Sequence, residues 1–311
     1  MNETHSGRQP AKAPTAKSQS ATWRDFYELG KPRVVMLIVF TAVVGMFLSV
    51  PGMVPLDKFI FGTIGIALAA SAAAAINHLL DRRADATMFR TRHRPLPTGH
   101  VTERQVLVYA LSLAMLSMII LTALVNTLTA VLTFCSIIGY AIIYTVYLKR
   151  ASPQNIVIGG AAGAAPPVLG WTAITGHVTA APLLLFLIIF LWTPPHFWAL
   201  AIHRREDYAK VGIPMLPVTH GVAFTKLHIL LYTILLLVIS IFPYLIGMSG
   251  IVYLLSALIL GGIFLYYAIR MKVSDDERLP MQTFWYSIIY LSLLFLMLLV
   301  DHYLPYLMQL L

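Results

Sequence analysis

Charged residues are scarce in this chain of 311 residues: 11% are Asp, Glu, Lys or Arg, whereas 59% are hydrophobic. Soluble domains usually carry about 25% charged residues. A soluble core of this composition would expose large apolar patches to water. Cysteine is also nearly absent, and the single Cys135 excludes a disulfide framework and a cysteine-based metal site. The composition therefore predicts an integral membrane protein.

Long apolar runs, by contrast, recur along almost the whole chain and leave no room for a soluble domain. A membrane-spanning helix needs about 20 mostly apolar residues. Nine segments satisfy this, at about 32–50, 58–80, 104–125, 128–147, 155–174, 181–202, 226–247, 249–270 and 283–305. We therefore predict an all-α polytopic membrane protein with nine transmembrane helices. The segment 155–174 is rich in glycine and contains Pro166-Pro167, so a re-entrant loop is the alternative there.

Lysine and arginine follow alternate connections between these segments. Of the 22 such residues, 21 precede the first span or follow spans 2, 4, 6 and 8, and only Lys58 lies on the other side. The positive-inside rule then places the N-terminus in the cytoplasm and the C-terminus opposite. This topology accounts for the basic excess without nucleic-acid binding. The polar N-terminus has no apolar signal-peptide core, so we expect a disordered cytoplasmic tail over 1–30 and a membrane domain over 31–311.

Carboxylates gather on the same side as the basic residues. Eleven of the thirteen are predicted to be cytoplasmic, and only Asp57 and Asp301 are not. The two long polar connections, about 81–103 and 203–225, are also cytoplasmic. Any chemistry is therefore expected at the cytoplasmic face.

The first of these connections begins with oxygen-bearing side chains at regular spacing. Asn77, Asp81 and Asp85 are four residues apart, so they share one face of a helix. Oxygen ligands without His or Cys favour Mg²⁺ or Ca²⁺, and Mg²⁺ typically completes its shell with substrate phosphate and water. Five arginines are expected to surround this site: Arg82, Arg83, Arg90, Arg92 and Arg94. The pattern predicts a Mg²⁺-diphosphate site. The alternative is a solvated helix at the membrane surface whose carboxylates pair with these arginines at a spacing of four residues.

A second cluster follows the sixth span. Glu206, Asp207 and Lys210 form an acidic-basic cluster there, and they are expected to close the diphosphate site from the other side. Arg90, Arg92, Arg94 and Lys210 are predicted partners of the diphosphate.

His196 lies inside the sixth span, after a proline pair expected to kink the helix. An ionisable side chain at that depth is a functional candidate. A packing histidine bonded to a freed backbone carbonyl is the alternative.

Four segments, in this order, resemble the intramembrane prenyltransferase (UbiA) superfamily: residues 77–95, 163–172, 195–201 and 207–218. The Asn-x-x-x-Asp-x-x-x-Asp stretch is the first signature of that superfamily. The other three segments are similar to its haem-modifying branch. The second acidic motif is shorter than in quinone-type members, which also favours that branch.

The resemblance implies nine helices around a central cavity, with Mg²⁺ as cofactor and farnesyl diphosphate and haem b as substrates. The implied reaction attaches a hydroxyethylfarnesyl group at a haem vinyl and gives haem O for terminal oxidases. The implied roles are metal binding for Asn77, Asp81 and Asp85, and a second site motif at Asp207 and Tyr208. His196 is a candidate contact to the haem or its vinyl. With haem as a substrate, a haem propionate is a second candidate partner for Arg90, Arg92, Arg94 and Lys210.

Two other functions stay open at this stage: prenyl transfer to another aromatic acceptor such as a quinone precursor, and a non-enzymatic haem or lipid transporter. Polar residues at one face argue against a path through the membrane. The lipid bilayer is the expected environment, as a bacterial inner membrane rather than a mitochondrial one. A terminal oxidase or the next haem-modifying enzyme is the implied protein partner.

Overall fold

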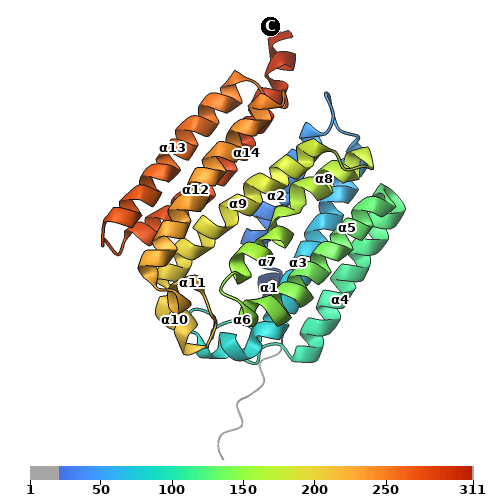
Figure 1. Ribbon diagram of the computed structural model, residues 1–311. Helices are drawn as coiled ribbons and strands as arrows, with labels where there is room; N and C mark the ends of the chain where they lie inside the picture. The colour runs from blue at the N-terminus through green and yellow to red at the C-terminus, as the bar shows by residue number, and fades with distance from the viewer. Residues whose placement is uncertain (1–20, 310–311) are drawn as a thin grey trace, which may run out of the picture.

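The computed structural model describes residues 21–309, and every regular element in that range is a helix. Figure 1 shows most of the helices running side by side as one bundle. In chain order the helices, with π-helical stretches marked η, are α1 (Trp23–Leu29), α2 (Pro32–Leu48), α3 (Leu56–Thr87), α4 (Glu103–Ile120), η1 (Leu121–Val125), α5 (Thr127–Ile138), η2 (Gly139–Leu148), α6 (Lys149–Ala151), α7 (Asn155–Ala164), α8 (Pro166–Thr175), α9 (Ala180–His203), α10 (Arg205–Lys210), α11 (Leu216–Thr219), α12 (Val222–Leu245), α13 (Ile251–Val273) and α14 (Leu279–Gln309).

The predicted polytopic all-α architecture is confirmed. Within the described residues, eight helical segments are long and apolar enough to cross a membrane, and α2 makes a ninth when it is joined to α1. Each of the nine predicted segments coincides with one of these helices. α7 and α8 continue as one apolar segment of 21 residues, which favours a crossing over the re-entrant loop. α9 runs through Pro194 and Pro195 without interruption.

The N-terminal boundary requires a correction. Residues 1–20 of the predicted tail lie outside the described residues, but Trp23–Leu29 is a helix and not a disordered segment. Thr22 starts α1 with a capping box, since its backbone N–H and hydroxyl both donate to Asp25 Oδ2, at 2.8 and 2.7 Å. α1 meets α2 at an angle of 52°. The bend falls at Lys31, which has a φ of 49° just before Pro32.

Two glycines allow α2 and α8 to pack backbone against backbone. A Cβ on Gly45 would lie 2.2 Å from the carbonyl oxygen of Pro167, and one on Gly170 would lie 1.9 Å from that of Ala42. Such close approach through small residues is typical of helix packing in membranes. It pulls the proline-rich α8 into the centre of the bundle, where its side chains are almost all buried.

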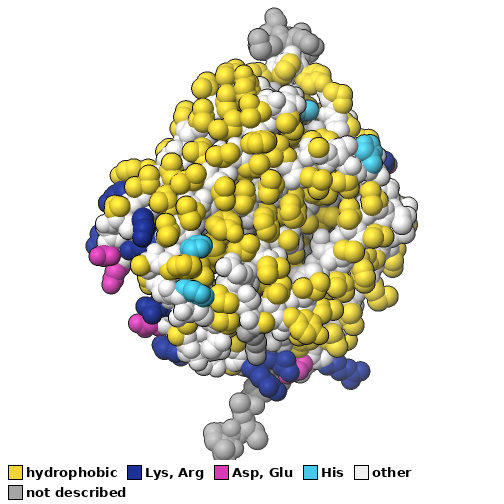
Figure 2. All heavy atoms as spheres, in the orientation of Figure 1, with side chains coloured by type: hydrophobic (Ala, Val, Ile, Leu, Met, Phe, Trp, Pro, Cys, Tyr) yellow, Lys and Arg dark blue, Asp and Glu magenta, His cyan; other side chains and the backbone are white. Residues whose placement is uncertain are grey.

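The bundle has one polar end. Figure 2 shows hydrophobic side chains over most of the visible face, while lysine, arginine and acidic side chains gather at the end that carries α10 and α11 and at the adjoining end of α13. α1 lies at this end, and the C-terminal end of α14 lies at the other (Figure 1). The described charges are thus sorted along the bundle axis as the sequence count predicts.

Asp301, one of the two carboxylates expected at the other end, has a structural explanation. It is 8% exposed and accepts hydrogen bonds from the backbone N–H groups of Gly250 and of Tyr253, the latter at 3.1 Å. Helix N-termini leave such N–H groups without partners and attract negative charge. Asp301 therefore joins α14 to the start of α13.

Candidate functional site

The predicted metal ligands form a buried row at the polar end of α3. Asn77, Asp81 and Asp85 are 5%, 4% and 5% exposed, and the amide of Asn77 donates to Asp81 Oδ2 at 2.8 Å. Burial of ionised carboxylates is unfavourable unless each is paired. The row must therefore have cationic partners inside the protein.

Each member of the row has a cation of its own, and each cation comes from a different segment. Lys31 Nζ donates to Asn77 Oδ1 at 2.6 Å, and Lys149 Nζ lies 2.5 Å from Asp81 Oδ2. The third contact joins the Arg94 guanidinium to Asp85 Oδ2 at 2.6 Å. None of these partners is four residues away on the same helix. The predicted alternative, a solvated helix with pairs along its own surface, is therefore wrong.

Lys31 and Lys149 are absent from the predicted site. Lys31 lies at the break between α1 and α2, and Lys149 follows η2 at the start of α6. Lys31 directly precedes the first predicted span, and Lys149 follows the fourth, so both lie at cytoplasmic ends of predicted membrane helices. This is the one feature of the sequence that places them at the same membrane depth as Asp81. η2 itself contacts the site, since the amide of Asn77 lies 3.4 Å from the hydroxyl of Thr145. π-helical stretches are frequent at functional sites.

The residues present fit a magnesium ion that is shared with a phosphate-bearing substrate. The Oδ1 atoms of Asp81 and Asp85 form no hydrogen bond with the described residues, because the contacts above all engage Oδ2. The same part of the chain contains no group of three His, Cys, Asp or Glu residues that could hold a metal. Two carboxylates and an amide are an incomplete shell. Mg²⁺ is characteristically bound in this way, with one or two carboxylates, substrate phosphates and water.

The second loop faces the first across this end of the bundle. Burial raises the pKa of Tyr208, and the nearby charges of Arg90 and Arg204 oppose that rise. The charge of Asp81 also acts on Tyr208. Tyr208 of α10 thus lies within electrostatic range of Asp81 at the polar end of α3. Asp207 is half-buried and Lys210 is exposed.

The arginines of the first loop separate into different groups. Arg94 alone contacts a member of the row. Arg92 is exposed and lies over the Phe89 ring at 4.6 Å, while Arg90 is exposed and its charge reaches Tyr208.

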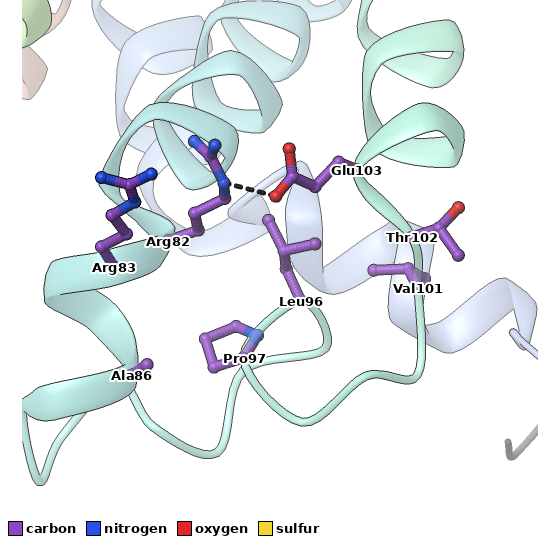
Figure 3. A pocket seen from close by; sticks show the side chains of 8 residues that line it. All are labelled: Arg82, Arg83, Ala86, Leu96, Pro97, Val101, Thr102 and Glu103. Carbon is purple, nitrogen blue, oxygen red and sulfur yellow. Dashed lines mark hydrogen bonds and ion pairs between the residues drawn. The ribbon is translucent and has the colours of Figure 1, made fainter.

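Arg82 and Arg83 point away from the row, because they are about 100° and 200° around the helix from Asp81. They line an open depression of about 450 Å³ between α3, the following loop and the start of α4. Figure 3 shows Arg82 directed toward Glu103, whose carboxylate lies 2.5 Å from its Nε. The expectation that all five arginines surround the site is therefore wrong for this pair.

His196 lies between two aromatic rings where α9 packs on α14. Its ring is stacked on Trp192, with centroids 4.3 Å apart, and on Phe284, with centroids 4.6 Å apart. Its Nδ1 lies 2.7 Å from the hydroxyl of Ser287. The partner is a serine and not the freed backbone carbonyl of the packing alternative. Nε2 forms no hydrogen bond with the described residues.

The UbiA prenyltransferase family model matches residues 38–302. The chain belongs to this family. The resemblance inferred from the four sequence segments is therefore confirmed. The match extends from the middle of α2 to the end of the apolar part of α14, so it includes every residue of the buried row.

Relatives of known name are similar over almost the whole chain. A protohaem IX farnesyltransferase of Methylococcus capsulatus is 64% identical over 282 residues, which is 91% of this chain and 95% of that protein. The protohaem IX farnesyltransferase of Thioalkalivibrio sulfidiphilus is 61% identical over 288 residues, 93% of this chain and 95% of its own length.

Solved structures of much lower identity share the fold. A digeranylgeranylglyceryl phosphate synthase has a TM-score of 0.76 at 18% identity and covers 90% of this chain and 98% of its own. A UbiA homologue from Archaeoglobus fulgidus, bound to DMAPP and Mg²⁺, has a TM-score of 0.61 at 16% identity, with coverage of 88% and 99%. The bundle described above is therefore the fold of this family.

Proposed function

We propose that this protein transfers the farnesyl group of farnesyl diphosphate to a vinyl group of haem b, giving haem O, with Mg²⁺ assisting departure of the diphosphate. The observation that carries the choice of substrates is the 64% identity to a protohaem IX farnesyltransferase over 91% of the chain. The buried row on α3 supports diphosphate chemistry in the same protein. It supplies oxygen ligands and three cations at the polar end of an apolar bundle.

Asn77, Asp81 and Asp85 are proposed to hold the ion through their oxygen atoms. Bound there with substrate, Mg²⁺ would supply positive charge that stabilises the leaving diphosphate. Lys31, Arg94 and Lys149 balance the charge of the row without substrate and can donate to phosphate oxygens once it is bound. The chain's own task is thus to bind, orient and neutralise the leaving group.

The remaining predicted residues are proposed to complete the site from the loops. Asp207 and Tyr208 both lie on α10, and the charge of Asp81 acts on Tyr208. Arg90, Arg92 and Lys210 are exposed at the polar end. Their cationic side chains suit a haem propionate or the outer oxygens of the diphosphate.

The apolar bundle suits both substrates. A farnesyl chain and a porphyrin are lipid-soluble, and an allylic carbocation must be kept from water until it reaches the acceptor. We place the protein in a bacterial inner membrane with its polar end and N-terminus in the cytoplasm. Haem O would pass from there to a terminal oxidase or to the next haem-modifying enzyme.

The reaction is tested with membranes that contain the protein, supplied with haem b, farnesyl diphosphate and Mg²⁺. Mass spectrometry of the extracted haem is expected to show the added hydroxyethylfarnesyl mass. Chelation by EDTA is expected to abolish this product, because the protein alone does not complete a metal shell. Restoring Mg²⁺ in excess over EDTA should restore it.

Two results would contradict the proposal. A folded protein that yields no modified haem would redirect the test to aromatic acceptors such as quinone precursors. Equal amounts of product with and without EDTA would show that the reaction needs no metal ion, while haem b would still be the acceptor.

His196→Ala is expected to lower turnover by about tenfold or more, which corresponds to roughly 1.4 kcal/mol or more of lost transition-state stabilisation. The variant should still insert and accumulate normally, since Trp192 and Ser287 keep their own hydrogen bond at 2.7 Å. Product formation per amount of inserted protein is the measurement. His177→Ala, at an exposed residue of the loop between α8 and α9, is the control. Unchanged turnover in His196→Ala would exclude His196 from the site.

A further inference from the structure

The hydroxyl of Ser287 is placed to decide which nitrogen of His196 carries the proton. Ser287 lies on α14 and is fully buried. Its hydroxyl donates to the carbonyl oxygen of Phe284 at 2.6 Å. A serine hydroxyl has one proton to donate and lone pairs with which to accept. Toward His196 Nδ1, 2.7 Å away, it can therefore only accept.

It follows that Nδ1 of His196 carries the proton and Nε2 carries the lone pair. In a neutral imidazole one nitrogen donates and the other accepts. Histidines that bind a metal almost always donate from the other ring nitrogen to a fixed acceptor, which sets both the tautomer and the ring orientation. His196 has this arrangement, although the described residues place no metal beside it.

The aromatic rings limit His196 in a second way. Trp192 and Phe284 cover the two faces of its ring, at interplanar angles of 19° and 26°. The Phe197 ring meets the imidazole at 81°, with centroids 4.9 Å apart. Only the rest of the imidazole edge is left for another molecule. A histidine that is an axial ligand of a haem iron presents the edge of its imidazole to the porphyrin and binds the iron through one nitrogen lone pair. Stacking and the Ser287 bond together leave Nε2 as the one polar atom on that edge.

We infer that Ser287 is a positioning residue that holds His196 with its Nε2 lone pair directed at the iron of the haem substrate. This inference rests on the proposed function, since it takes haem b as the acceptor. Ser287 also fixes the position of its neighbours, because its backbone carbonyl accepts from Trp192 Nε1 at 2.7 Å. One residue of α14 thus orients both the ligand and one of the rings that cover it.

The test measures binding of haem b alone, without farnesyl diphosphate, by titration of the Soret band with the purified protein. His196→Ala is expected to shift the band and weaken binding. Ser287→Ala removes only the hydroxyl and should weaken binding by about 10- to 100-fold, the usual effect of losing a residue behind a metal ligand. Ser287→Thr keeps a hydroxyl and should bind as the unmodified protein does.

The double variant separates positioning from general damage. Ser287→Ala combined with His196→Ala should bind haem no more weakly than His196→Ala alone, because the hydroxyl acts only through the histidine. Ser240→Ala is the matched control. Ser240 is equally buried on α12, with its hydroxyl bonded to Leu236 O at 2.7 Å and paired with Tyr290, and its loss should leave the Soret band unchanged.

Three outcomes would overturn the inference: an unchanged Soret band in His196→Ala, unchanged binding in Ser287→Ala, or additive losses in the double variant. If Ser287→Thr does not accumulate, the comparison of the single and double alanine variants still decides. Product formation by the unmodified protein is measured in parallel. If the unmodified protein forms haem O but His196→Ala leaves the Soret band unchanged, only the contact between His196 and the iron is excluded. Absence of haem O removes the proposed function itself.

Discussion

Asp81→Asn is expected to reduce haem O formation by about 10²- to 10⁴-fold, since a metal ion contributes several kcal/mol to stabilisation of charge in a transition state. The substitution keeps the size of the side chain and removes one buried charge. It leaves Lys149, now 2.5 Å from Asp81 Oδ2, facing a neutral amide. Both the metal and the charge balance of the row are lost together.

The measurement is the rate of product formation over a range of Mg²⁺ concentrations. Asp57→Asn is the matched control, because Asp57 lies on the same helix, is exposed and is in its first turn at the other end. It should retain the unmodified rate. Normal rates and normal Mg²⁺ dependence in Asp81→Asn would refute the assignment of the metal site.

Gly170→Ala is expected to prevent normal folding. The added methyl would lie 1.9 Å from the carbonyl oxygen and 2.7 Å from the carbonyl carbon of Ala42. Overpacking of a well-packed core usually costs about 1–3 kcal/mol. Here the obstacle is backbone and cannot rotate away, so α2 and α8 must separate. The folded yield and the midpoint of thermal unfolding in detergent are the measurements.

Gly163→Ala supplies the comparison. Gly163 lies on the neighbouring helix α7, and nothing lies within 4 Å of a Cβ placed there. Because alanine favours a helix over glycine by about 1 kcal/mol, this variant should be as stable as the unmodified protein or slightly more so. Equal stability of the two variants would show that the contact between α2 and α8 is looser than described.

The buried row explains how a membrane protein can keep carboxylates inside without a ligand. Burying an unpaired charge is prohibitively unfavourable, and removing one partner of a buried pair typically costs about 3–5 kcal/mol. Arg94 and Lys149 each pair with one carboxylate, and Lys31 donates to Asn77 beside them. The same three side chains are those that a diphosphate would need, so one arrangement serves both states of the site.

Many properties of this protein depend only on residues close together in the chain, and the sequence therefore predicts them. Hydropathy determines which segments can be helices in a bilayer, because each must satisfy its own backbone hydrogen bonds there. The alternation of lysine and arginine depends only on the order of the spans. Asn77, Asp81 and Asp85 share a face because four-residue spacing nearly completes a helical turn. The family resemblance likewise rests on short segments in a fixed order.

Only the tertiary structure decided which groups meet across the bundle. Lys31 and Lys149 are 46 and 68 residues from the side chains that they contact, and Ser287 is 91 residues from His196. It also separated Arg94 from Arg82 and Arg83, which the sequence alone groups together, and it replaced part of the predicted tail by α1. Such pairings depend on how helices pack and rotate against each other. Spacing along one helix carries no information about its neighbour, so the composition of the site followed from the fold.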